Sequence, residues 1–270
     1  MLIDVNGIQL NVEIEGEGAP LLLLHGFTGS TTSWQWIVPF LRNQYQVILI
    51  DLIGHGRSDA PADSTRYSMD YAVQDLLSVL DYLQLGKINL LGYSMGGRCA
   101  LHFAVHFPQR VQTLILESSS PGIEDDLERK ARCRSDEALA AFIEEQGLEA
   151  FVKKWTNLDL FATQQQLPEK IKNEVRLQRF QNKPQGLANS LRGMGTGVQQ
   201  SLWSRLEQLD IPTLLLVGKK DAKFRQVGVS MDEMIPNSTL QIIPDAGHTI
   251  HLEKPMQFAN AVKNFLSLHT

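Results

Sequence analysis

Short apolar runs alternate with amphipathic stretches along most of the chain, and this rhythm predicts the fold class. An alternating pair over 2–10 and 11–15, around the turn pair Asn6-Gly7, is typical of a β-hairpin. The apolar runs expected to form buried strands span residues 20–24, 46–51, 88–91, 111–117, 212–218 and 240–243. Helical periodicity covers residues 69–83, 98–106 and 256–268. Strands that alternate with helices favour an α/β fold with a mostly parallel central sheet and helices on both faces.

One segment breaks this rhythm. From 121 to 208 the sequence is charged and helix-rich and contains no strand-like run. We therefore expect residues 1–120 and 209–270 to form a single core and residues 121–208 to form a helical insertion between two core strands. Ligands of such sheets bind at the carboxyl ends of the strands, so an insertion that leaves from this edge would cover the binding crevice as a lid.

A candidate nucleophile lies where a predicted strand meets a predicted helix. The sequence there is Gly92-Tyr93-Ser94-Met95-Gly96-Gly97, which has the G-x-S-x-G pattern of a nucleophile elbow. This pattern needs small residues two positions before and after the serine, because the strand turns at once into a helix and the two backbones come close. The motif predicts that the Ser94 hydroxyl oxygen is the reactive atom.

A serine hydroxyl becomes reactive only when an imidazole accepts its proton and a carboxylate orients that imidazole. The order nucleophile, acid, histidine is satisfied by Ser94, Asp221 and His248, and the last two follow predicted strands at the edge that carries Ser94. Asp245 is the rival acid, but it lies very near His248 in sequence. The backbone N–H groups of Phe27 and Met95 are expected to form an oxyanion hole.

Composition and charge narrow the possible partners and location. The chain has 270 residues and a net charge of −5, which offers no electrostatic case for binding nucleic acid. The first residues lack the basic and apolar segments of a signal peptide, and no stretch is long enough to span a bilayer. We expect a cytoplasmic protein without membrane insertion, whose two cysteines, Cys99 and Cys133, are reduced thiols.

The sequence predicts neither a metal nor an organic cofactor. His102 and His106 have the spacing of a zinc-binding helix, but no glutamate follows the first of them as in H-E-x-x-H. The glycine-rich segment 193–197 lacks the preceding strand of a dinucleotide site, and no Gly-Lys-Ser or Gly-Lys-Thr is present for a P-loop.

Several motifs together resemble known families. His25-Gly26-Phe27, the segment Asp51–Ser58, the elbow, Asp221 and His248 are similar to the α/β-hydrolase superfamily, and this resemblance covers nearly the whole chain outside the insertion. Four stretches resemble, more specifically, the 2-succinyl-6-hydroxy-2,4-cyclohexadiene-1-carboxylate synthases of menaquinone and phylloquinone biosynthesis. These stretches are Gly92–Arg98, Glu117–Gly122, Arg132–Asp136 and Gly218–Phe224.

The second resemblance implies a lyase that acts on a small polycarboxylate. Such enzymes eliminate pyruvate from 2-succinyl-5-enolpyruvyl-6-hydroxy-3-cyclohexene-1-carboxylate, whose carboxylates need bidentate cationic partners. The substrate-binding residues implied by the family match are Tyr93, Arg98, Arg132, Trp155, Phe161 and Arg179. Arg134 is an alternative to Arg132, and Arg176 is an alternative to Arg179.

The implied mechanism is proton abstraction by Ser94, which His248 and Asp221 make basic, while the oxyanion hole holds the enolate. A serine hydrolase with the same triad, either a carboxylesterase or a carbon–carbon bond hydrolase, is the alternative function. A hydrolase-fold receptor for a small ligand is a third possibility, which a complete triad disfavours. The sequence leaves the oligomeric state open, and it does not choose between the two quinones.

Overall fold

The computed structural model describes residues 1–269, which contain one eight-stranded sheet of order β1-β2-β4-β3-β5-β6-β7-β8. Strands β3 to β8 run parallel to one another, whereas β1 and β2 pair antiparallel. The strands are β1 (Leu2–Val5), β2 (Ile8–Glu15), β3 (Ala19–Leu24), β4 (Tyr45–Ile50), β5 (Ile88–Tyr93), β6 (Val111–Glu117), β7 (Thr213–Gly218) and β8 (Ser238–Ile243). The predicted fold class, an α/β fold with a mostly parallel sheet, is confirmed.

Nine α-helices lie among the described residues. They are α1 (Val38–Leu41), α2 (Met69–Tyr82), α3 (Met95–His106), α4 (Asp126–Thr156), α5 (Glu169–Arg179), α6 (Pro184–Met194), α7 (Ala222–Met234), α8 (Ile250–Glu253) and α9 (Pro255–Ser267). The sequence pattern did not predict α7. Only Gly228 and Met231 of this helix are buried, and the apolar stripe that packs on the core, Val227, Met231 and Met234, is narrow and partly exposed.

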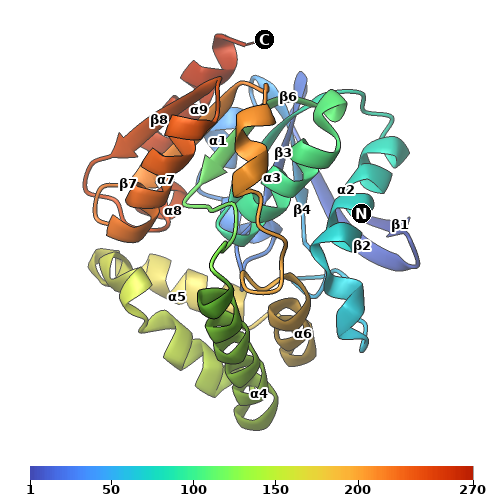
Figure 1. Ribbon diagram of the computed structural model, residues 1–270, viewed down its shortest axis with the longest axis vertical. Helices are drawn as coiled ribbons and strands as arrows, with labels where there is room; N and C mark the ends of the chain where they lie inside the picture. The colour runs from blue at the N-terminus through green and yellow to red at the C-terminus, as the bar shows by residue number, and fades with distance from the viewer. Residues whose placement is uncertain (270) are drawn as a thin grey trace.

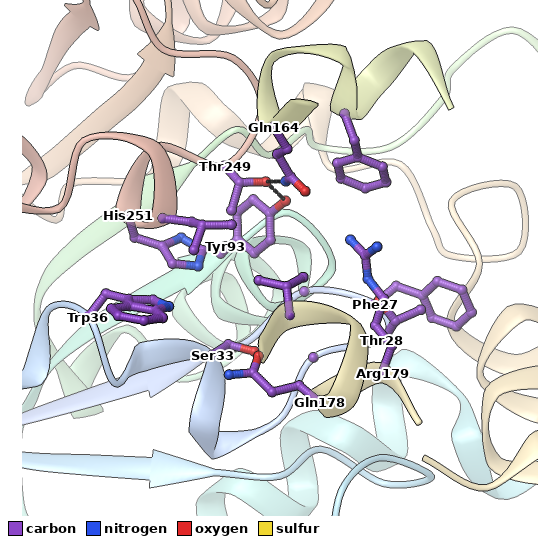
Figure 2. A pocket seen from close by; sticks show the side chains of 15 residues that line it. Phe27, Thr28, Ser33, Trp36, Tyr93, Gln164, Gln178, Arg179, Thr249 and His251 are labelled. Atoms are coloured by element: carbon purple, nitrogen blue, oxygen red, sulfur yellow. Dashed lines mark hydrogen bonds between the residues drawn. The ribbon is translucent and has the colours of Figure 1, made fainter. Parts of the chain in front are cut away.

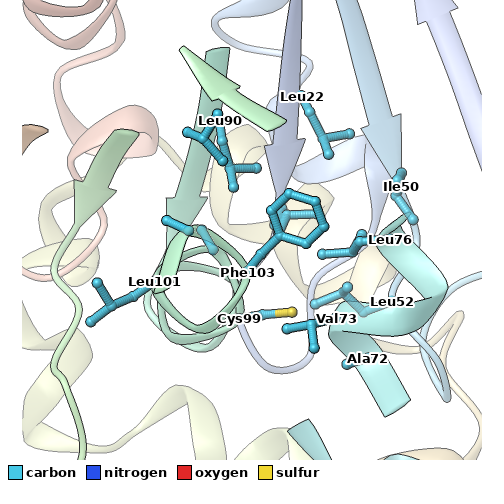
Figure 3. Packing of buried hydrophobic residues seen from close by; sticks show 14 of the residues in the cluster. Leu22, Ile50, Leu52, Ala72, Val73, Leu76, Leu90, Cys99, Leu101 and Phe103 are labelled. Carbon is cyan, nitrogen blue, oxygen red and sulfur yellow. The ribbon is translucent and has the colours of Figure 1, made fainter. Parts of the chain in front are cut away.

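The core consists of two apolar layers, one on each face of the sheet. Alternate residues of β3 divide between them, because successive side chains of a strand point to opposite faces. Leu22 and Leu24 pack with α2 and α3, while Leu21 and Leu23 pack with α1 and α9. Figure 3 shows the first layer, in which Phe103 of α3 lies between the sheet and α2. Because helices cover both faces of the sheet, a ligand site is expected at the carboxyl edge, where the strands end.

Helices α4, α5 and α6 lie in the chain between β6 and β7 and gather together at one end of the molecule (Figure 1). Helices α4 and α6 share an apolar cluster that includes Ile143 and Phe151 of α4 and Leu187 of α6, and Phe180, directly after α5, packs against it. Helix α4 is broken at Gly147, whose φ of 78° is outside the helical range. The break turns the second half of α4, with Trp155, in a new direction.

The α4–α6 pair is also held by charge and is docked closely on the core. Arg192 of α6 bonds to Glu137 and Glu144 of α4, at 2.8 Å and 2.6 Å. A Cβ added at Gly186 of α6 would lie 2.2 Å from the backbone oxygen of Gly54, which follows β4. This backbone-to-backbone approach sets the position of α6 over the carboxyl edge of the sheet.

Candidate active site

Ser94 occupies a strained turn between β5 and α3. Its φ of 50° and ψ of −107° lie outside the regions that side chains favour, and its backbone N–H donates to the Glu117 carbonyl at 2.8 Å. Two glycines make the turn possible. A Cβ at Gly96 would lie 2.1 Å from the Leu24 carbonyl oxygen, and one at Gly92 would lie 2.4 Å from the carbonyl oxygen of Gly96.

The structure brings the three predicted triad residues into one hydrogen-bonded chain. His248 Nε2 lies 3.1 Å from Ser94 Oγ, and His248 Nδ1 lies 2.7 Å from Asp221 Oδ2. Asp221 also caps α7, because its Oδ1 accepts the Phe224 N–H at 3.2 Å. The Asp221 carboxylate is thus held in place both by the N-terminus of α7 and by His248. Asp245, the rival acid, is 75% exposed and lies 3.8 Å from Lys220.

A cavity of about 430 Å³ opens over Ser94 and His248. Phe27 and Met95 line it, and neither of their backbone N–H groups donates to another described residue. Met95 is the first residue of α3, where the helix dipole adds positive potential. Their geometry is suited to an oxyanion hole.

Buried His25 shapes the loop that carries Phe27. Its Nε2 accepts the Leu52 N–H at 3.0 Å, so Nδ1 carries the proton and donates to the Gly26 carbonyl at 2.8 Å. Burial lowers the pKa of His25 to about 4, and burial with neighbouring His25 lowers the pKa of His55 to about 3. Both imidazoles are neutral at pH 7.

Basic side chains gather in the same cavity. Arg98, Arg132 and Lys223 line it together with one carboxylate, that of Glu128. Burial, and then the charge of Arg132, lower the pKa of Arg98 to about 10, so it still carries its charge at pH 7. Arg98 donates through Nη1 to the Met194 carbonyl at 2.7 Å and to Gln199, and Arg132 donates through Nε to Asp136 at 2.8 Å. The remaining N–H groups of both guanidinium groups have no hydrogen-bond partner among residues 1–269.

Arg179 differs from the other predicted arginines because it lines a second, smaller cavity of about 60 Å³. Figure 2 shows its guanidinium pointing into this space, near Phe27 and across from the hydrogen-bonded group of Tyr93, Thr249 and Gln164. Arg179 is 6% exposed, donates to Thr156 at 2.7 Å and lies over the Phe161 ring.

The two cavities share walls. The residues common to both are Phe27, Tyr93 and Phe161. Trp155 lines the larger cavity only, and its ring lies 5.7 Å from that of Phe161. The alternatives Arg134 and Arg176 are both exposed and line neither cavity. Of the predicted aromatic residues, Tyr93 and Phe161 therefore line both cavities, and Trp155 lines the larger one.

No cluster of three or more His, Cys, Asp and Glu within residues 1–269 is arranged to hold a metal. His106 Nδ1 lies 2.8 Å from the His102 carbonyl oxygen, as expected for an ordinary helix face. Cys99 and Cys133 are free thiols, as predicted. None of the described helices is both long and apolar enough to cross a membrane.

Several site residues were missed by sequence reasoning. Asp136 pairs with Arg132, and its i, i+4 spacing from that arginine was a readable signal. Phe224 packs on the His248 ring at 4.6 Å, and nothing in its sequence context marks this role. Glu117 and His251 form a buried pair beside the triad, with Oε2 of the first 2.7 Å from Nδ1 of the second. A glutamate at the carboxyl end of a predicted core strand was a signal for Glu117, but nothing in the sequence indicated His251 as its partner.

Comparisons with known proteins agree with this arrangement. A family model described as the alpha/beta hydrolase fold matches residues 19–255. A putative 2-succinyl-6-hydroxy-2,4-cyclohexadiene-1-carboxylate synthase of Bacillus subtilis is 46% identical over 97% of this chain and 96% of its own length. The synthase of that name from Serratia proteamaculans is 31% identical over 91% of this chain and 92% of its own.

The fold is also similar to a solved structure described as MenH from S. aureus. The TM-score is 0.92 and the identity 37%, over 96% of this chain and 98% of the other. A likeness of this extent includes the helices between β6 and β7 as well as the sheet.

The triad geometry predicts how Ser94 reacts with a fluorophosphonate probe. Ser94→Ala should abolish labelling, and His248→Ala or Asp221→Asn should slow it about 10²- to 10⁴-fold, because the hydroxyl loses its base or the base its orientation. The double variant should be hardly slower than either single variant, since the residues act as a unit. Ser120→Ala, in the same cavity, is the control and should label normally. Labelling of Ser94→Ala at the parent rate would contradict the assignment.

The buried histidines predict that stability falls in mild acid. His25 and His55 have folded pKa values of about 4 and about 3, below the ordinary 6.5, so the unfolded chain binds their protons first. The unfolding free energy should therefore fall as the pH falls from about 6.5 to 4, by up to about 1.4 kcal/mol per pH unit for each histidine. Urea unfolding of the parent and of His55→Asn at a series of pH values measures this dependence. If the unfolding free energy falls equally steeply with decreasing pH in both proteins, the prediction is wrong for His55.

Proposed function

This chain belongs to the α/β-hydrolase fold family and to its 2-succinyl-6-hydroxy-2,4-cyclohexadiene-1-carboxylate synthases, and from this premise we propose how its residues perform the reaction. The enzyme eliminates pyruvate from 2-succinyl-5-enolpyruvyl-6-hydroxy-3-cyclohexene-1-carboxylate. The product is 2-succinyl-6-hydroxy-2,4-cyclohexadiene-1-carboxylate, an intermediate of quinone biosynthesis.

Ser94 removes the ring proton next to the succinyl ketone. His248 Nε2, 3.1 Å from Ser94 Oγ, takes the hydroxyl proton, and Asp221 stabilises the imidazolium through Nδ1. The electrons of the broken C–H bond move onto the ketone oxygen, where the N–H groups of Phe27 and Met95 hold the enolate. No covalent bond to Ser94 is needed.

Collapse of the enolate completes the elimination. Its electrons form a ring double bond, the existing ring double bond shifts by one position, and the carbon–oxygen bond to the enolpyruvyl group breaks. Pyruvate leaves as its enolate and takes up one proton, so the triad returns to its starting state. Neither water nor a cofactor enters the balance.

The single observation that carries this proposal is the charge environment of Arg179. This guanidinium is buried, burial lowers its pKa to about 10, and no carboxylate lies within salt-bridge distance of it among residues 1–269. A buried cation without an anionic partner is costly, and a substrate carboxylate would supply that partner. A neutral ester would leave the charge unpaired.

We place one substrate carboxylate in the small cavity beside Arg179, while the reacting carbon stays near Ser94. The shared walls of Phe27, Tyr93 and Phe161 support this placement, because they put the small cavity directly beside the cavity that holds Ser94. The free N–H groups of Arg98 and Arg132 would bind the other carboxylates. The partner is thus a small polycarboxylate, and Trp155 forms a wall for its ring.

We further propose that residues 121–208 act as the lid of a core formed by 1–120 and 209–270. Arg132, Trp155, Phe161 and Arg179 all come from this segment, so its closure would complete the carboxylate site. A cytoplasmic location is proposed on the basis of the two free thiols, which are typical of a reducing compartment.

The lyase proposal predicts a change in substrate preference when Arg179 is removed. Arg179→Ala should lower kcat/KM for the enolpyruvyl substrate, followed by release of pyruvate and the absorbance of the diene. The expected loss is about 10- to 150-fold, which corresponds to about 1.5–3 kcal/mol for a charge-assisted hydrogen bond. The rate with a neutral p-nitrophenyl ester should hardly change. Arg176→Ala, an exposed arginine of the same helix, is the matched control and should keep both rates.

The outcomes separate the two candidate functions. If the parent releases pyruvate and Arg179→Ala releases it more slowly, the result supports the lyase with a carboxylate site at Arg179. If the ratio of kcat/KM for the enolpyruvyl substrate to kcat/KM for the ester is the same in Arg179→Ala and the parent, Arg179 does not bind the substrate. A parent enzyme that hydrolyses the ester but releases no pyruvate would instead be the serine hydrolase.

A further inference from the structure

Two glutamates hold the loop that carries His248. The Glu253 carboxylate accepts the backbone N–H groups of the residues on either side of this histidine, from Gly247 at 2.7 Å and from Thr249 at 3.3 Å. The Glu117 carboxylate accepts the His251 backbone N–H at 3.0 Å and lies 2.7 Å from its Nδ1.

Glu117 also contacts the nucleophile turn. Its carbonyl oxygen accepts the Ser94 N–H, while its side chain, 0% exposed, holds His251 three residues beyond His248. The His251 ring is packed between Trp34 and Tyr93, at centroid distances of 4.5 Å and 4.8 Å. A single residue at the end of β6 therefore links both halves of the Ser94–His248 pair.

This support matters because the strand before His248 offers little. β8 is an edge strand that pairs only with β7, and most of its side chains are half-buried or exposed. Asp221 orients the imidazole ring but makes no hydrogen bond to the backbone of the loop. The loop backbone is held at Ala246, whose carbonyl accepts the Lys220 N–H at 2.9 Å, and around His248 itself by carboxylates from α8 and β6.

We propose that Glu253 and Glu117 are positioning residues that set the distance between His248 Nε2 and Ser94 Oγ. The inference rests on the proposed role of His248 as the base. Neither glutamate touches the substrate, so both act only through the backbone that carries His248 and through His251.

The two glutamates differ in how they should tolerate glutamine. Both Glu253 oxygens accept main-chain N–H groups, which cannot become acceptors, so Glu253→Gln leaves one of these donors unpaired. In Glu117→Gln the amide NH₂ can face Nδ1, because the His251 imidazole can change its tautomer and accept. The first change is expected to shift the loop, and the second is not.

The experiment measures the rate of Ser94 labelling by a fluorophosphonate together with kcat and KM for pyruvate release. Glu253→Gln should slow labelling and kcat about 10- to 100-fold and leave KM within about twofold, because a shift of about 1 Å disturbs proton transfer but not carboxylate binding. Glu117→Gln should stay within about threefold of the parent in labelling rate, kcat and KM. Glu117→Ala, which removes both contacts to His251, should slow labelling and kcat as Glu253→Gln does, and an unchanged rate in a folded Glu117→Ala would exclude Glu117 from the positioning role. The low-field proton resonance of the His248–Asp221 hydrogen bond should move in Glu253→Gln but not in Glu117→Gln.

Asp75→Asn provides the matched control for lost stability. Asp75 is a 2% exposed carboxylate of α2, bonded to Arg66 at 2.7 Å, and it lines neither cavity. The Asp75→Asn variant should have a lower melting temperature than the parent, while its labelling rate and kcat remain normal. If Glu253→Gln folds and labels at the parent rate, or if Asp75→Asn slows labelling as much, the positioning role is refuted.

Labelling of Ser94 does not depend on which substrate the enzyme uses. The inference can therefore fail while pyruvate release stands, and it can hold when pyruvate is not the product.

Discussion

The close approach of three backbone segments at the nucleophile turn is the constraint on which the rest of the site depends. Gly96 lies so near the Leu24 carbonyl that a single methyl group would occupy the same space. Because β3, β5 and α3 meet without side chains between them, Phe27 and Met95 line the same cavity as Ser94. The nucleophile and the proposed oxyanion hole thus depend on one packing arrangement.

Charge burial is the second determinant, and it explains why a hydrolase scaffold is suited to an elimination. The triad alone is compatible with many reactions. What distinguishes this chain is that Arg98 and Arg179 are both nearly buried and that their hydrogen-bond partners are neutral oxygens of residues 121–208. Arg98 donates to Met194 and Gln199, and Arg179 donates to Thr156. Such cations favour a ligand that brings several negative charges into a partly dry space. In the proposed role of residues 121–208 as a lid, the ligand would contribute to the stability of the closed state.

The sequence could predict the parts of the fold that have strong hydrophobic periodicity or positions where only glycine fits. The buried strands and α3 have nearly continuous apolar runs, and the elbow needs glycine at fixed positions, so both are readable locally. Helix α7 has only a narrow, partly exposed apolar stripe, Val227, Met231 and Met234, and the sequence pattern did not identify it. The separation of Arg179 from the main cavity, the Glu117–His251 pair and the two main-chain bonds of Glu253 could not be predicted, because they depend on how distant segments meet.

The central claim is that the reaction begins with proton abstraction at the ring carbon next to the succinyl ketone. Substrate carrying deuterium at that carbon tests it most directly, with the products analysed by mass spectrometry and a reaction without enzyme as the control for spontaneous exchange. The account predicts a diene that has lost the label, pyruvate in equal amount, and slower turnover than with unlabelled substrate. A ring product that retains the deuterium after pyruvate has been released would contradict it.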